Sequence, residues 1–225
     1  MIKIEGVSKT FGEGKELFAA LKSIDLEVKE GECVILSGIS GSGKSTLLSL
    51  IAALDRPSSG KIVVDGELIS KLPDLHASAY RAKIIGVVFQ HFNLLESLSV
   101  EENVIIPLIN SGLDMPTIHL MAEQAMQRAL IQHKSSQDVS SLSGGEKQRC
   151  AIARALVHDP KIILCDEPTA NLDRENSLKF IEMIQRLHET GKTIIVATHD
   201  PLFDKLPFES RIIHMEDGAI GSSSE

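Results

Sequence analysis

A glycine-rich segment near the start of the chain has the residues of a phosphate-binding loop. Residues 38–46 read Gly-Ile-Ser-Gly-Ser-Gly-Lys-Ser-Thr and follow the apolar run 33–36 after a single serine. Glycines let backbone N–H groups curl around phosphate oxygens, and the start of a following helix faces the same anion. Lys44 would reach the β- and γ-phosphates of a nucleotide, and the Ser45 hydroxyl would bind Mg²⁺. A flexible Gly/Ser turn is the alternative, but the position between an apolar run and a helical stretch favours a nucleotide site formed by Gly38, Ser40, Gly41, Ser42, Gly43, Lys44, Ser45 and Thr46.

Two adjacent acids, Asp166 and Glu167, follow a second apolar run at 162–165. Because the carboxyl ends of parallel strands meet at one edge of a sheet, these carboxylates would lie beside the phosphate-binding loop. Asp166 would hold Mg²⁺, directly or through water, and Glu167 would orient and deprotonate an attacking water. Acids at a strand end are often merely solvated. Their combination with the loop favours phosphoryl transfer.

A third segment, 142–149, reads Leu-Ser-Gly-Gly-Glu-Lys-Gln-Arg and opens the helical stretch 150–157. Ser143 and the amides of Gly144 and Gly145 would stand at a helix N-terminus, which can bind a γ-phosphate. A plain helix cap is the alternative for this segment taken alone. Together, the three motifs resemble the ATP-binding-cassette (ABC) family, whose signature is Leu-Ser-Gly-Gly followed by a polar residue and Gln-Arg.

The resemblance covers essentially the whole chain and implies roles that spacing alone does not assign. Gln90 matches the glutamine that links nucleotide and Mg²⁺ to the helical segment and the membrane partner. His199 matches the histidine that contacts the γ-phosphate, whereas a lone histidine is more often structural. Phe11 matches the aromatic that stacks on adenine, and Phe18 is the alternative. The implied catalytic residues are Lys44, Gln90, Glu167 and His199, and the implied metal ligands are Ser45, Gln90 and Asp166.

The resemblance also implies ATP and Mg²⁺ as cofactors and a head-to-tail homodimer. Residues 170–173, ending in Asp173, match the loop that crosses the dimer interface. In such a dimer Ser143 and Gly145 of one protomer meet the γ-phosphate that Lys44 of the other holds. ATP would then close the interface and hydrolysis would open it, so that the chain drives an integral-membrane transporter subunit.

Composition limits the other function classes. The 225 residues are 43% hydrophobic and 24% charged, which is typical of a globular domain with a substantial core. A formal net charge of −8 argues against broad attraction to nucleic acid or anionic lipid, so membrane contact is expected only through a protein partner. No apolar run is long enough to cross a bilayer, and the first residues lack the apolar block of a signal peptide. We expect a cytoplasmic protein, peripheral on the cytoplasmic face of the inner membrane, with its three cysteines reduced and buried.

Hydrophobic patterns indicate the elements that must position these residues. The alternation at 24–29 predicts a half-buried antiparallel strand, and Asp65-Gly66 predicts a tight hairpin. The apolar runs 33–36, 84–88, 162–165 and 194–197 predict a buried parallel sheet, and residues 173–189 predict an amphipathic helix. The fold class is therefore α/β. By resemblance it is a P-loop NTPase with a mixed parallel core sheet, an N-terminal antiparallel β subdomain and a helical insertion.

One domain is expected over 1–225. Its core would comprise about 1–90 and 158–220, its helical subdomain about 91–157, and residues 221–225 would form a frayed end. Within the family, residues 81–95, 102–104 and 107–108 resemble the branch of lipoprotein-releasing ATPases, macrolide and peptide exporters and the cell-division ATPase. Glu96 departs from the proline common there. Polar amino-acid importers share part of the pattern, and a regulator of cell-wall hydrolysis that transports nothing is a further alternative. A soluble family member acting in DNA repair or translation is disfavoured, because such members carry a coiled-coil insertion or two cassettes.

Overall fold

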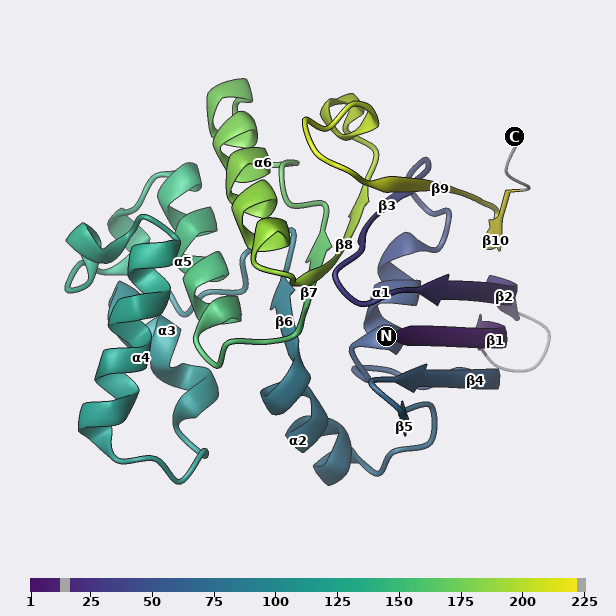
Figure 1. Cartoon of the computed structure of the whole chain (residues 1–225), viewed down its shortest axis with the longest axis horizontal. Helices are drawn as coiled ribbons and strands as arrows, with labels where there is room; N and C mark the ends of the chain where they lie inside the picture. The colour runs from purple at the N-terminus through teal and green to yellow at the C-terminus, as the bar shows by residue number, and fades with distance from the viewer. Residues whose placement is uncertain (13–16, 222–225) are drawn as a thin grey trace.

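The chain, described by a computed structural model over residues 1–12 and 17–221, forms two β-sheets with helices between and beside them (Figure 1). The expected frayed end at 221–225 falls almost wholly outside the described residues. The antiparallel sheet has the order β2 (Phe18–Val28), β1 (Ile2–Phe11), β4 (Ser59–Val64) and β5 (Glu67–Leu68). The core sheet has the order β10 (Ala219–Ile220), β9 (Arg211–Glu216), β3 (Cys33–Ser37), β8 (Thr193–Thr198), β7 (Ile162–Asp166) and β6 (Ile85–Val88).

The predicted parallel sheet is confirmed. Strands β9, β3, β8, β7 and β6 are parallel neighbours, and β10 adds an antiparallel edge. Every residue of β8 is buried, as continuous apolar runs in a sheet covered on both faces predict. Only the strand expected at 84–88 starts late, because Ile84 still belongs to the preceding helix.

Helix α1 (Lys44–Ile51) packs between the two sheets. It contacts β2 and β4 on one side and β7 and β8 on the other. Its buried Leu47 and Ile51 join a core with Ile4 of β1 and Ile195 of β8. The predicted hairpin is also confirmed: Val64 pairs with Glu67, and Asp65 and Gly66 have φ of 50° and 82°. Such positive angles at both central residues are those of the tight turn that matches strand twist. The antiparallel sheet therefore anchors the helix that follows the phosphate-binding loop.

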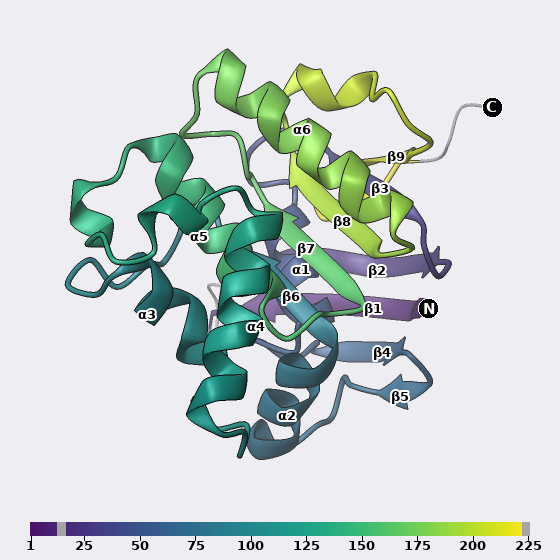
Figure 2. The ribbon, with the colours of Figure 1, turned by 60° about the vertical axis from the view of Figure 1, so that its left-hand side comes forward.

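The opposite face of the core sheet is covered by helices. Helix α6 (Arg174–Glu189) buries Phe180 and Ile184 in a core shared with Ile163 and Val196 of the sheet, and Figure 2 shows α6 beside β8. The remaining helices are α2 (Asp74–Ile84), α3 (Val100–Ile105), α4 (Met115–Arg128) and α5 (Gly144–Leu156), with 3₁₀ turns at Ile106–Leu108, Gln132–Lys134, Val139–Ser141 and Pro201–Asp204.

Helices α3, α4 and α5 contact one another and form the left-hand part of Figure 1. Helix α5 also packs on β6, and the division of the chain at about 91 and 158 stays a prediction. Across residues 1–12 and 17–221, the helices lack the combination of length and apolar character that crossing a membrane requires.

Tyr80 joins α2 to α1 through a buried hydrogen bond. Its hydroxyl donates to the Ile51 carbonyl over 3.0 Å, and the residue is 3% exposed. Burial raises the pKa of this phenol, so the hydroxyl keeps its proton at any ordinary pH. Tyr80→Phe should lower the free energy of unfolding by about 1–2 kcal/mol, because it leaves the Ile51 carbonyl unpaired. Urea denaturation with an unchanged m-value checks this, and an unchanged midpoint would contradict it.

Candidate functional site

The phosphate-binding loop, the paired acids and His199 each follow a strand of the core sheet, and all three lie at the same edge of it. Ser37 at the end of β3 pairs with Thr198 of β8, and Asp166 at the end of β7 pairs with Ala197. Gly38, Glu167 and His199 are the next residues of these strands. The strand order β3-β8-β7 therefore places the phosphate-binding loop, the paired acids and the histidine side by side.

The loop 38–43 is held close to neighbouring backbone. A Cβ built on Gly38 would lie 2.2 Å from the Met215 carbonyl oxygen of β9, and one on Gly43 would lie 2.7 Å from the Ala20 carbonyl oxygen. Gly43 is also the N-cap of α1 and has a φ of 100°. Glycine is thus required at both ends of the loop. The first turn of α1 carries no acid, so its free N–H groups and positive dipole end suit an anion.

Gly38→Ala should therefore destabilise the chain by at least about 2 kcal/mol without nucleotide, since the new methyl group overlaps backbone that cannot move freely. Gly41→Ala is the matched control: Gly41 also has a positive φ, 84°, but nothing lies within 4 Å of its Cβ position. Its cost should be about 1 kcal/mol, from backbone strain alone. Equal urea midpoints for the two variants would show that the loop relaxes away from β9.

Lys44 lies inside this loop and is 4% exposed. Its Nζ donates to the carbonyl oxygens of Gly38 over 2.7 Å and of Ile39 over 3.0 Å. The same Nζ lies 3.6 Å from Oε1 of Glu167. Among the described residues, Glu167 is the one carboxylate that forms an ion pair with this buried ammonium, which is therefore placed to gain from an additional anion.

Ser45 and Asp166 offer two oxygen atoms at the same place. The Ser45 hydroxyl donates to Oδ1 of Asp166 over 2.7 Å. Burial raises the pKa of Asp166 and Glu167 adds to the shift, while the Ser45 hydrogen bond and Lys44 oppose it. A carboxylate beside a hydroxyl is the oxygen chemistry that Mg²⁺ takes, so these residues fit the ion. A bound cation would favour the charged form of Asp166.

Glu167 contacts both Lys44 and His199. Nδ1 of His199 lies 2.9 Å from Oε1 of Glu167, and the His199 backbone N–H donates to Oε2 over 3.3 Å. With its ring proton on Nδ1, His199 donates to this carboxylate. Glu167 has a φ of 44°, and its own N–H donates to the Ala197 carbonyl. A left-handed angle at a non-glycine residue is costly and is typical of functional sites.

A pocket of about 250 Å³ lies at this edge of the core sheet. The sequence-predicted residues on its wall are Phe11, Ser40, Gly41, Ser42, Gly43, Lys44, Ser45, Thr46, Gln90 and Glu167, together with the alternative aromatic Phe18. Gly38 does not line the pocket, but its carbonyl accepts a hydrogen bond from Lys44. Asp166 contacts it through Ser45, and His199 through Glu167.

Phe11 and Phe18 stand at the rim as partners on β1 and β2, with exposed fractions of 44% and 62%. Nζ of Lys9 lies 4.8 Å from the Phe11 ring centroid and covers one face of that ring. The exposure of both rings at the rim of the pocket is compatible with stacking of a purine on either one. Stacking on Phe11 stays a prediction.

The predicted residues of the Leu-Ser-Gly-Gly segment lie elsewhere. Ser143 is the N-cap of α5, and its hydroxyl donates to Oε2 of Glu146 over 2.8 Å. Asp173 is the N-cap of α6. None of the described residues that line the pocket belongs to 143–145 or is Asp173. A Cβ on Gly145 would lie 2.5 Å from Oδ1 of Asn176, so any side chain at this position would displace the Asn176 amide of α6. One copy of the chain therefore presents the two halves of the predicted site apart from each other.

Three residues that the sequence analysis did not single out hold the loop after Gln90. Nδ2 of Asn171 donates to the Gln90 carbonyl over 2.9 Å. The guanidinium of Arg154 donates to the carbonyls of Phe92 and Asn93, both of which have positive φ. Asn103, 0% exposed, bonds to both N–H and carbonyl of Leu95. The only sequence signal was the position of Asn171 and Asn103 inside segments matched by resemblance.

Comparisons with known proteins agree with this geometry. A family model described as ABC transporter matches residues 21–170, more than half of the chain. The chain is 42% identical to the ABC transporter ATP-binding protein YknY of Bacillus subtilis, over 100% of this chain and 96% of that protein. It is 39% identical to the lipoprotein-releasing system ATP-binding protein LolD of Pseudoalteromonas translucida, over 98% and 94% of the two chains.

Among solved structures, the ATP-binding cassette MJ0796 of Methanocaldococcus jannaschii is similar, with a TM-score of 0.90 and 39% identity over 99% of this chain and 97% of that one. That cassette is a dimer in a post-hydrolysis state, bound to ADP and Pi. The present chain belongs to the ABC transporter family, and its fold is that of an ABC ATPase cassette. The predicted family and fold are thereby confirmed.

Proposed function

We propose that this chain hydrolyses ATP in the pocket of Lys44, with Mg²⁺ held by Ser45, Gln90 and Asp166. The observation that carries the proposal is the position of Glu167, 3.6 Å from Nζ of Lys44 and 2.9 Å from Nδ1 of His199. A carboxylate fixed between a lysine that binds phosphate and a histidine is suited to a general base. The Ser45–Asp166 pair beside it supplies the metal ligands.

The chain's own groups would divide the work as follows. Lys44 and the first N–H groups of α1 bind and orient the phosphates, and this positioning is a large part of phosphoryl-transfer catalysis. Glu167 orients a water molecule and accepts its proton, while His199 holds the carboxylate in place and reaches the γ-phosphate. Mg²⁺, when bound, neutralises charge on the phosphates.

We propose further that two copies act head to tail around two ATP molecules. The separation of the pocket from Ser143, Gly144, Gly145 and Asp173 in one copy supports this, because a second copy can supply them. The dimeric state of the similar cassette supports it as well. Ser143 would exchange its bond to Glu146 for one to the γ-phosphate of the partner's ATP.

A groove of about 770 Å³ beside the Gln90 loop is the proposed docking site for a helix of an integral-membrane subunit. Its wall combines apolar residues of three segments, among them Leu75, Val87 and Pro107, with Arg154, which also holds the Gln90 loop. Such a mixture of apolar floor and charged edge suits an amphipathic helix. Docking here would place the chain at the cytoplasmic face of the membrane through protein contact alone.

Phosphate release from Mg-ATP tests the two-copy site. Each active site needs two chains, so turnover per chain should rise with protein concentration until the dimer saturates, and chelation of Mg²⁺ should abolish it. Turnover per chain that is independent of concentration, in a range where gel filtration shows monomer, would contradict the proposal.

The transport system is proposed to be of the export or lipoprotein-release type. The similarity to LolD supports this branch. The alternatives are an amino-acid importer and a regulator of cell-wall hydrolysis that acts without transport. Purification of the chain with its membrane subunit separates them: a four-helix subunit with a large external domain fits the proposed branch, and a many-helix permease paired with a solute-binding protein fits the importer. Loss of cell-wall cleavage without loss of transport would identify the regulator.

A further inference from the structure

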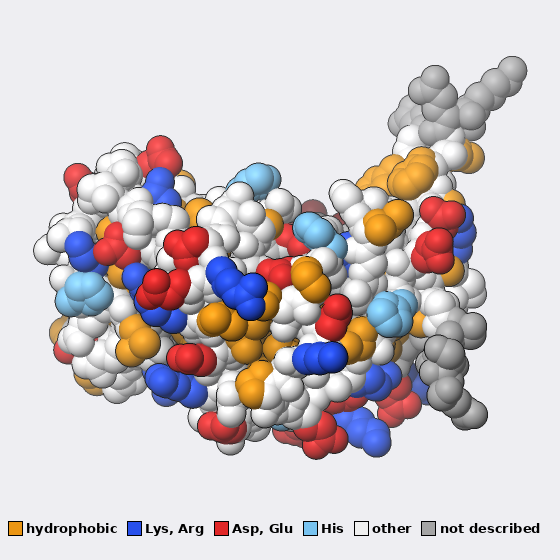
Figure 3. All heavy atoms as spheres, turned by 90° about the horizontal axis from the view of Figure 1, so that it is seen from above, with side chains coloured by type: hydrophobic (Ala, Val, Ile, Leu, Met, Phe, Trp, Pro, Cys, Tyr) orange, Lys and Arg blue, Asp and Glu red, His pale blue; other side chains and the backbone are white. Residues whose placement is uncertain are grey.

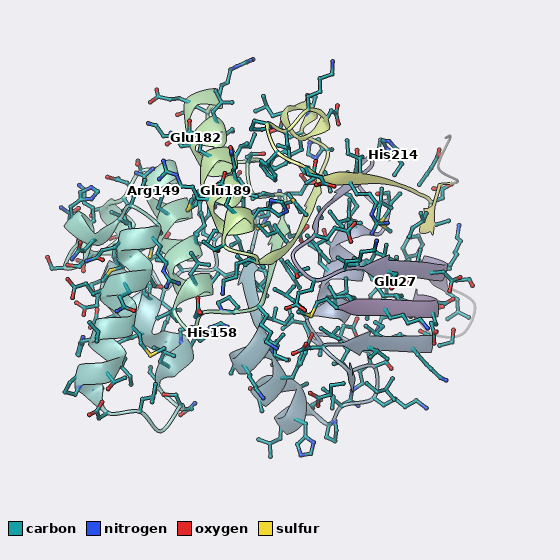
Figure 4. The ribbon with its side chains drawn as sticks, viewed as in Figure 1. Glu27, Arg149, His158, Glu182, Glu189 and His214 are labelled. Carbon is teal, nitrogen blue, oxygen red and sulfur yellow. The ribbon has the colours of Figure 1, made fainter. Side chains whose placement is uncertain are left out.

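A second cleft, of about 270 Å³, lies between α5, α6 and the end of α4. Figure 4 labels Arg149 on α5 and Glu182 on α6, which line it from two sides. It shares no wall residue with the pocket of Lys44. Its wall includes Gly145 and Leu172 of the two segments proposed to face the partner copy, but the proposed ATPase reaction assigns no role to the other residues that line it.

The deep wall of this cleft is apolar. Ile152 of α5 and Phe180 of α6 are each 2% exposed, and Leu172 and Met183 are half-buried beside them. A concave apolar surface of this size, with a few polar groups, has the properties of a small-molecule site. It would hold the apolar body of a ligand.

The edge of the cleft is strongly basic. Four cationic side chains and one acid line it, in a chain whose net charge is −8: Arg128, Arg149, Lys179 and Arg186 against Glu182. Arg128 and Lys179 already pair with Asp159 and Glu175. Arg149 and Arg186 form no ion pair or hydrogen bond within the described part of the chain. Figure 3, which looks down on this side of Figure 1, shows hydrophobic side chains gathered next to Lys and Arg side chains.

Gln148 completes the wall from α5. The residue is 2% exposed, and within residues 1–12 and 17–221 neither its Oε1 nor its Nε2 has a hydrogen-bond partner. Buried amides in proteins nearly always have partners, and leaving one unpaired is costly. A rotation of this side chain toward the cleft would let Nε2 donate to an anionic oxygen there.

We propose that the cleft binds a small organic anion, with an apolar body against Ile152 and Phe180 and an acidic group held by Arg149, Arg186 and Gln148. The three observations are independent: the apolar wall sets the size and body of the ligand, the two unpaired guanidinium groups set its charge, and the buried amide supplies a directed donor. A cationic molecule with the same body should be rejected.

Two probes with the same phenylbutyl body and opposite charge test the proposal: 4-phenylbutyrate and 4-phenylbutylamine. Calorimetric titration of the full chain should show binding of the anion and none of the amine. Saturating Mg-ADP should leave the anion's affinity unchanged, which distinguishes this cleft from the nucleotide pocket. Loss of anion binding with Mg-ADP, equal binding of both probes or no binding of the anion would each overturn the proposal.

Variants locate the site. Arg149→Gln with Arg186→Gln should weaken the anion at least tenfold, and Gln148→Leu should weaken it several-fold without lowering the melting temperature of the free chain. Lys71→Gln, an exposed charge outside the cleft, is the control and should change nothing. If the double variant does not fold, Arg186→Gln alone decides, because this side chain is exposed. Unchanged affinity in a folded variant lacking Arg186 would exclude the cleft.

Discussion

Glu167→Gln is expected to bind ATP normally, to lose at least about a hundredfold in turnover, and to accumulate as an ATP-bound dimer. Removing a general base costs roughly 10²–10⁴-fold, and the glutamine keeps the size of the side chain. The triphosphate would therefore remain intact between the two copies, and the event that opens the dimer would not occur. Phosphate release measures the turnover, and gel filtration with light scattering in Mg-ATP measures the dimer.

Glu30→Gln is the matched control, because Glu30 is an exposed carboxylate away from the pocket. It should keep full turnover and remain monomeric at low protein concentration. A Glu167→Gln chain that binds ATP but elutes only as monomer would count against the two-copy site. One that keeps near-normal turnover would remove Glu167 from the role of base.

Lys44→Ala should weaken ATP binding by about 10- to 100-fold, because a charge-assisted hydrogen bond contributes roughly 1.5–3 kcal/mol. The change removes the one ammonium placed inside the loop, and it also leaves the carbonyls of Gly38 and Ile39 without their donor. Part of the effect should therefore be a loosened loop. Equilibrium binding of a fluorescent ATP analogue measures the affinity.

Ser45→Ala should also weaken the binding of ATP, but chiefly when Mg²⁺ is present, because the Ser45 hydroxyl is a proposed metal ligand. Comparing affinities with Mg²⁺ and with a chelator separates the two variants: Lys44→Ala should be weak in both conditions, whereas Ser45→Ala should differ from the native chain only with the metal. Native affinity in either variant would take that residue out of the site. Lys71→Ala serves as the charge control.

The chemistry at the sheet edge could be predicted because it depends on short segments. Residues 38–46 and 162–167 each carry an apolar strand followed by functional side chains, and parallel strands bring such ends together whatever their order. The loop after β3 and the acids after β7, which β4, β5 and β6 separate in the sequence, lie at the same edge of the core sheet. The sequence does not contain the strand order itself, which decides that His199 on β8 lies between the loop and the acids.

Other contacts could not be predicted, because they join side chains to distant backbone carbonyls. Arg154 on α5 binds the carbonyls of residues 92 and 93, and nothing in the sequence around it distinguishes it from a surface arginine. The same holds for Lys9, whose ammonium covers one face of Phe11. Such contacts follow from tertiary packing, and the spacing of residues along the chain does not predict them. The cationic residues of the cleft between α5 and α6 come from three helices. Their positions in the sequence therefore did not predict that they lie together.

The most direct measurement of the central claim is a thiol cross-link between the two halves of the site. All three native cysteines are buried, so reactive thiols can be introduced without removing them. In the Glu167→Gln background, Ile39→Cys and Ser141→Cys place exposed thiols next to the phosphate-binding loop and next to Ser143. The account predicts that a short bifunctional reagent joins two chains in Mg-ATP, that no covalent dimer forms without nucleotide, and that either cysteine alone gives none. A cross-link confined within single chains, or a dimer yield that ATP does not change, would contradict it.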